Sequence, residues 1–218
     1  MSRFARDTNG IMGLTLSSLG LTIATGILLL VIFSFLFLGN WQRTSELQRI
    51  ATGFSTIVEG MDTIFYENTT IFRFPDKNYG YHVELSTEYI VVSAQGNFNT
   101  EISVKKRFLI HPWLQNHTLN SNWTTGNELH NMYLSSTYHH NGTKSDPIDS
   151  ANITTVQSYL TNMSTRIQYC LAVQPLQIST GEVVCIEKTF LYYDTDGNGT
   201  WAKQNDECQE LLLLYQYE

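Results

Sequence analysis

The sequence contains little charge and little proline, and each shortage excludes a class of structure. Only 15% of the residues are charged, and none of them lies between Asp7 and Arg43. An uncharged run of this length, flanked by polar sequence on both sides, is not typical of a buried helix in a soluble domain. The first of the four prolines is Pro75, so no proline breaks a helix before that point.

Basic residues and catalytic motifs are also scarce. Beyond Leu38 the chain carries eleven Lys and Arg against nineteen Asp and Glu, which leaves a net charge near minus eight. This balance argues against nucleic acid or anionic lipid surfaces as partners. The sequence has no nucleophile elbow, metalloprotease helix or phosphate-binding glycine loop, so we expect no enzymatic activity and no required cofactor.

Cysteine is rare, and the number of cysteines is odd. Cys170, Cys185 and Cys208 all lie in the last quarter of the chain. In an exported protein this number allows one disulfide plus one free thiol or one intermolecular bond. The spacing does not select the pair.

The dominant feature of the chain is the apolar run at residues 11–38, which follows a short tail at residues 1–10. It is long enough to cross a bilayer as a helix. A cleaved signal peptide is the competing interpretation, but its apolar region usually has about 7 to 15 residues and ends at small residues. This run is longer and ends in Phe37-Leu38-Gly39-Asn40-Trp41, so we predict one transmembrane helix.

Two observations predict the orientation of this helix. Arg3 and Arg6 precede the run, and basic tails tend to stay in the cytoplasm. Seven glycosylation sequons all follow the run, which favours an extracellular C-terminal domain at the cell surface. Their asparagines are Asn68, Asn116, Asn122, Asn141, Asn152, Asn162 and Asn198.

Small residues recur within the apolar run at a spacing that lets helices pack closely in lipid. Gly13 and Ser17 form one small-xxx-small pair, and Gly20 and Ala24 form another. Lateral helix packing is one interpretation, and the general abundance of glycine in membrane helices is the other.

The segment at residues 39–66 has apolar residues at helical spacing. It predicts an amphipathic extension of the membrane helix, and one helix over residues 10–66 would be about 85 Å long. The apolar positions are Leu47, Ile50, Ala51, Phe54, Ile57, Val58, Met61, Ile64 and Phe65.

The remaining residues, 67–218, are expected to form one β-rich domain. Alternating or β-branched runs predict strands at residues 79–85, 88–94, 102–110, 166–178, 182–193 and 207–217. Residues 111–165 are polar and rich in sequons, which indicates a surface insertion with one short helix after Asp146-Pro147. Five histidines in this insertion have no metal-site spacing, and we expect them in solvated loops. The predicted fold is α+β, with the long helix packed on an antiparallel sheet.

One loop has the oxygen spacing of a calcium-binding segment. Asp194, Asp196 and Asn198 stand at alternate positions before Gly199, but the twelfth position is Asn205 rather than glutamate. A plain hairpin turn between residues 190–193 and Trp201 is the favoured alternative.

The tail, the glycine beside an apolar helix, the amphipathic continuation and the C-terminal β domain together resemble archaeal type IV pilins and pilin-like proteins. The resemblance implies cleavage by a prepilin peptidase between Gly10 and Ile11, and assembly with other pilin-like subunits through the N-terminal helix. Asn9 precedes the glycine and Thr15 stands five residues beyond the cut, where the family often has a basic residue and a glutamate. The resemblance therefore implies a minor pilin, a pseudopilin or an unprocessed anchor. A monomeric single-pass surface receptor with a ligand-binding β domain is the alternative.

Overall fold

One unbroken helix, α1 (Thr8–Asp62), contains both the apolar run and the amphipathic segment. The computed structural model describes residues 8–97, 100–115 and 122–216, with side chains from Ser17 onward, so most of the predicted tail 1–10 lies outside the described residues. At 1.5 Å per residue the 55 residues of α1 span about 82 Å. The helix continues through Gly39 and Asn40, which confirms the predicted continuity.

The two halves of α1 have different surroundings. Residues 19–35 are exposed throughout, and the most apolar stretch of the helix has no part buried inside the protein. By its length and composition α1 is therefore a candidate membrane span, and a signal sequence near an N-terminus can meet the same criteria. In the second half Leu47 and Phe54 are fully buried. Phe65 is 91% exposed because the helix ends at Asp62, before the predicted stripe does.

The α+β fold class is confirmed, with two four-stranded sheets in place of one. Sheet A has the order β1-β7-β8-β5, and sheet B has the order β4-β3-β2-β6. The strands are β1 (Asn68–Arg73), β2 (Tyr81–Leu85), β3 (Tyr89–Gln95), β4 (Glu101–Arg107), β5 (Trp113–Leu114), β6 (Leu176–Ile178), β7 (Val183–Tyr192) and β8 (Cys208–Gln216). β5 runs parallel to β8, and every other pair in the two sheets is antiparallel.

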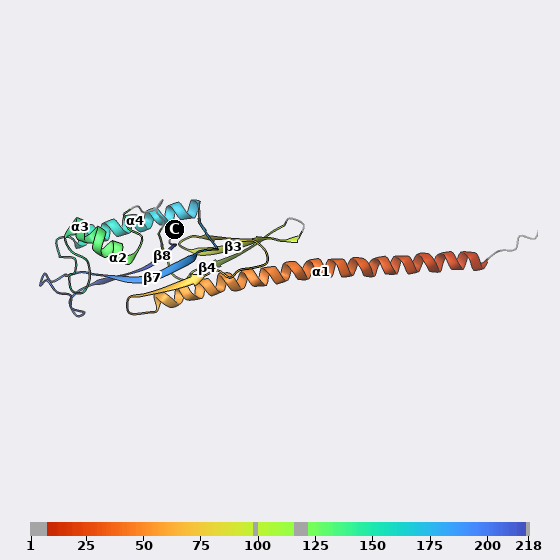
Figure 1. Ribbon diagram of the computed structural model, residues 1–218, viewed down its shortest axis with the longest axis horizontal. Helices are drawn as coiled ribbons and strands as arrows, with labels where there is room; N and C mark the ends of the chain where they lie inside the picture. The colour runs from red at the N-terminus through yellow and green to blue at the C-terminus, as the bar shows by residue number, and fades with distance from the viewer. Residues whose placement is uncertain (1–7, 98–99, 116–121, 217–218) are drawn as a thin grey trace, which may run out of the picture.

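The sheets lie between α1 on one side and the remaining helices on the other (Figure 1). α1 contacts β3, β4 and β7, whereas α4 (Ile153–Val173) contacts β5. Phe54 of α1 lies within 5.1 to 6.2 Å, between ring centroids, of Phe72, Phe74 and Phe108. This aromatic cluster joins the helix to strands and loops distant in sequence, so the second half of α1 belongs to the core of the domain.

Two predictions about the β domain are wrong. Residues 166–173 are the end of α4, and only Leu176–Ile178 of the expected strand 166–178 is β-structure. The helix prevails because Val156, Leu160, Met163, Ile167 and Leu171 recur every three or four residues and are all buried. The expectation of one short helix within residues 111–165 is also wrong, since α4 begins there at Ile153 and has 21 residues, and the segment also holds α2 (Gly126–Glu128), the π-helical turn η2 (Leu129–Leu134) and α3 (Ser135–Tyr138).

Candidate functional site

The apolar half of α1 offers one candidate functional surface. The predicted cleavage residues Gly10 and Ile11 lie near the start of α1, and Gly13 lies in the same stretch, for which the structure describes no side chains. Ser17, Gly20 and Ala24 are exposed. A β-carbon added at Gly20 would meet no atom within 4 Å, so the space beside this glycine on the helix surface is unoccupied.

The spacing of these small residues places them on one face. At 100° per residue, positions 13, 17, 20 and 24 fall within a narrow arc, whereas Gly26 falls on the opposite side of the helix. A β-carbon at Gly26 would also meet no atom within 4 Å. The two glycines are therefore equally accessible and differ in the face of the helix that they occupy.

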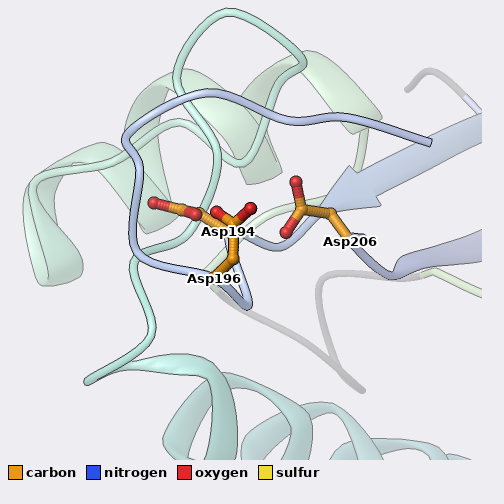
Figure 2. Close-up of side chains that lie close together, drawn as sticks. All are labelled: Asp194, Asp196 and Asp206. Carbon is orange, nitrogen blue, oxygen red and sulfur yellow. The ribbon is translucent and has the colours of Figure 1, made fainter. Parts of the chain in front are cut away.

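The acidic loop between β7 and β8 is the second candidate, at the end of the domain farthest from the apolar helix (Figure 1). Carboxylate oxygens of Asp194, Asp196 and Asp206 lie within 4.8 Å of one another (Figure 2). The structure thus brings all three predicted calcium ligands together, since Asn198 Nδ2 donates to Asp196 Oδ2 at 2.9 Å, and it adds Asp206. The Asn198 Oδ1 atom, which would have to bind the cation, instead accepts bonds from Thr200 N at 2.8 Å and Thr200 Oγ1 at 2.7 Å.

Backbone amides hold these carboxylates. Asp194 is buried, and its two carboxylate oxygens accept bonds from the N–H groups of Gly197, Asn198 and Gly199 at 2.7 to 3.1 Å. Gly197 and Gly199 have φ angles of +74° and +81°, which favour glycine.

Asp206 is held in the same way, by Ala202 N at 2.7 Å and Thr195 N at 2.8 Å. The bond from Ala202 is the main cause of the lowered pKa of Asp206.

The arrangement has the oxygen ligands that calcium prefers, but it also has a complete structural explanation without a cation. The loop is longer than the expected tight turn, since β8 begins at Cys208 rather than near Trp201. Trp201 instead packs edge-on against Tyr192 with ring centroids 4.9 Å apart. Calcium binding therefore stays a prediction.

All three cysteines are free thiols in this structure. Cys185 pairs with Tyr215 and Cys208 pairs with Tyr192, so the two cysteines lie seven residues apart along the β7–β8 ladder. That separation is about 23 Å, far beyond the Cα distance of about 7 Å that a disulfide tolerates. Within one chain the pair Cys185–Cys208 is excluded by the register.

One of the five insertion histidines is not in a solvated loop. His130 is 7% exposed and lies between η2 and sheet A. Its Nδ1 is 2.6 Å from Asn141 O, and its Nε2 is 2.9 Å from Thr189 Oγ1. His111 and His139 are exposed, His140 is half-buried, and His117 lies outside the described residues. The expectation is wrong for His130 because η2 presents its side chain to β7.

The predicted sequons are distributed over the domain. Asn122, Asn162 and Asn198 are exposed, whereas Asn68, Asn141 and Asn152 are half-buried. Asn116 lies outside the described residues. Exposure at three sites is compatible with glycan attachment.

Sequence reasoning missed a buried lysine that fixes the end of α1. Lys188 is 2% exposed, and its Nζ donates to Asp62 O at 2.5 Å and lies 2.8 Å from Glu210 Oε2. A cation at a helix C-terminus satisfies the free carbonyls and the helix dipole. The available signal was a lysine in the middle of a ten-residue strand whose other residues are apolar except Glu187 and Thr189.

No protein-family description, curated protein or solved structure matches this chain.

Proposed function

We propose that the protein is a membrane-anchored, pilin-like surface component that acts by display and assembly and has no chemistry of its own. The single observation that carries the proposal is the continuity of α1. Its exposed apolar first half continues without a break into a second half that is buried in the core of the β domain. A bilayer would supply the apolar environment that the first half lacks within the chain.

The same helix supports lateral assembly. Ser17, Gly20 and Ala24 lie on one exposed face, where a neighbouring helix can approach the backbone closely. Because α1 runs straight into the domain core, an association of helices in the membrane would also set the spacing of the outer domains. In this proposal the partners are other pilin-like subunits.

The proposed orientation has the N-terminus in the cytoplasm and the β domain outside the cell. The exposed sequons at Asn122, Asn162 and Asn198 support this side assignment, as do Arg3 and Arg6 before the span. Protease treatment of intact cells should then remove the β domain, and full protection of the domain would reverse the orientation.

A cavity favours the second candidate function, a monomeric surface receptor. It has a volume of about 300 Å³ and is lined by residues of both sheets, among them Leu85 of sheet B and Leu114 and Leu214 of sheet A. Polar groups of Gln177 and Gln216 also line it. This size is at the lower end of pockets that hold small organic ligands.

One pair of variants separates the two functions. Gly20→Leu places a bulky side chain on the face that carries the small residues. Gly26→Leu makes the same change on the opposite face and serves as the control. A pilin-like function predicts loss of subunit cross-linking in native membranes for Gly20→Leu only. A monomeric receptor tolerates both changes, since lipid accepts leucine as readily as glycine.

The mature N-terminus provides an independent measurement. Mass spectrometry of protein purified from its native cells should find Ile11 as the first residue if a prepilin peptidase acts. An intact N-terminus combined with equal behaviour of the two leucine variants would leave the receptor as the better description.

A further inference from the structure

The β3–β4 hairpin contacts α1 at the place where its apolar run ends. Asn97 N donates to Asn40 Oδ1 at 3.0 Å, and Asn97 Nδ2 donates to Leu36 O at 3.3 Å. Gly39 faces the same side chain, because a β-carbon there would lie 3.2 Å from Asn97 Nδ2. The hairpin therefore reaches the last turn of the apolar run (Figure 1).

A second set of contacts holds this end of the domain against the helix. Arg43 Nη1 donates to Gln95 O at 2.7 Å, and the Arg43 guanidinium lies 5.4 Å from the ring centroid of Tyr79. Tyr79 in turn donates to Glu46 Oε2 at 2.9 Å, and Lys77 Nζ lies 3.2 Å from the same oxygen. These contacts hold the hairpin against α1, so the position of α1 in a bilayer would also set the position of the hairpin.

The surface formed by α1 and the hairpin carries the residue types that are common where a protein meets lipid headgroups. Trp41 is 64% exposed directly after the apolar run, and tryptophan is enriched at the level of lipid headgroups. Where the hairpin meets the helix, an open groove of about 710 Å³ is lined by Arg43, His82 and Glu101, among others. A guanidinium matches phosphate through paired N–H donors, and Arg43 uses one of its five for Gln95.

We propose that this end of the domain is seated in the headgroup layer of a zwitterionic phospholipid bilayer, with Arg43 bound to lipid phosphate and Glu101 facing the ammonium group. The proposal rests on the membrane anchoring in the proposed function. Polar backbone such as that of Asn97 does not enter the hydrocarbon, so the hydrocarbon ends near Leu36. Counting back about 20 residues, or about 30 Å, places its other boundary near Ser17.

Tryptophan fluorescence in the full-length protein tests this seating. In a Trp41→Phe background, Thr100→Trp adds a probe in the exposed turn of the hairpin, and Lys106→Trp adds the control probe. The Trp41→Phe parent retains the other three tryptophans, and its signal is subtracted from that of each probe variant. Lys106 is also exposed on β4, six residues further on and therefore about 20 Å away. In phosphatidylcholine vesicles that contain a headgroup-spin-labelled lipid, we expect the Thr100→Trp signal to be quenched at least about twofold more than the Lys106→Trp signal.

The outcomes separate the seating from the anchoring. Equal quenching of the two probes in protein that floats with the vesicles overturns the seating and leaves the anchoring intact. Protein that stays in the aqueous fraction overturns the anchoring and the seating with it. Before either comparison, thermal unfolding should show that both probe variants retain the folded domain.

The phosphate contact has its own measurement. In vesicle-bound protein labelled with ¹⁵N-arginine, solid-state NMR should detect dephasing of a guanidinium signal by lipid ³¹P, and Arg43→Gln should reduce that dephasing. Arg49→Gln is the matched control, because Arg49 is exposed on the same helix but farther from the apolar run. Unchanged dephasing in the Arg43 variant overturns the assignment of Arg43 to the phosphate.

Discussion

The two halves of α1 are built from similar apolar residues but obtain their apolar surroundings from different sources. Phe33 in the first half is 67% exposed, whereas Phe54 in the second half is fully buried. The first half is apolar on every face, whereas the second half buries most of its apolar residues along one stripe that packs in the core of the domain. The periodicity of the apolar residues, more than their number, therefore decides whether the protein itself covers them.

The largest expected effect comes from replacing one phenylalanine by alanine in each half and comparing the losses in stability. Phe54→Ala removes a ring that contacts Phe72, Phe74 and Phe108, and should lower the free energy of unfolding of the domain by about 3 to 5 kcal/mol. Phe33→Ala, the matched control, should change it by less than about 0.5 kcal/mol. Denaturant unfolding in detergent measures both, and equal effects would break the comparison.

A second variant tests how the buried half is fixed at its far end. Lys188→Ala removes the cation that contacts Asp62 O and Glu210, and we expect a loss of about 2 kcal/mol in the free energy of unfolding. The loss is below that of a fully buried pair because the Glu210 side chain is 48% exposed. Lys188→Met keeps the packing of the stem and should cost less. If Lys188→Ala unfolds like the unmodified protein, the lysine does not anchor the helix.

The pH dependence of the unfolding free energy tests the contacts where the two halves of α1 meet. Burial, followed by the hydrogen bond to Glu46, raises the pKa of Tyr79 from 10.0 to about 12. The folded state then holds the proton more tightly than the unfolded state, so the stabilisation is complete below pH 10 and is lost as the pH rises towards 12.

Tyr79→Phe should therefore weaken the fall in unfolding free energy over this alkaline range. The fall should not vanish, because burial also raises the pKa of Tyr81. Tyr66→Phe, which alters an exposed ring, is the control, and identical pH profiles for the two variants would contradict the assignment.

The smallest effect concerns the loop farthest from the apolar half. Because backbone amides already bind the carboxylates of Asp194 and Asp206, we expect EDTA to leave the Tm of the domain unchanged. Millimolar calcium should also have no effect. A calcium-dependent rise in Tm that disappears in Asp194→Asn would instead establish a cation site.

Repeating patterns of apolar residues, together with the absence of charge and proline, predicted much of this structure. The unbroken α1 followed from the absence of charge and proline, and the strands β2, β3, β4, β7 and β8 followed from alternation and β-branched runs. Of the nine predicted stripe positions seven lie on α1, and six of these are buried as the helical spacing predicts. Local periodicity is sufficient for such elements because each buries one face along its whole length.

The remaining features depend on contacts between segments distant in sequence. Leu176–Ile178 is a strand only because it pairs with β2, and Trp113–Leu114 is a strand only through its parallel pairing with β8. Asp206 joins Asp194 because the loop folds back, although the carboxylates are twelve residues apart. The contact of Asn97 with Leu36 and Asn40 likewise spans about sixty residues, and no periodic pattern encodes it.

The strand order of sheet A has a consequence for biosynthesis. Among the described strands β8 comes last in the chain, yet it lies inside sheet A between β7 and β5. The stripe of α1 that includes Phe54 leaves the ribosome about 130 residues before β7, the last strand with substantial contacts to α1, begins. A nascent chain therefore exposes this apolar surface until β7 is made, and termination before Cys208, which leaves β7 without its partner β8, should yield an aggregation-prone fragment.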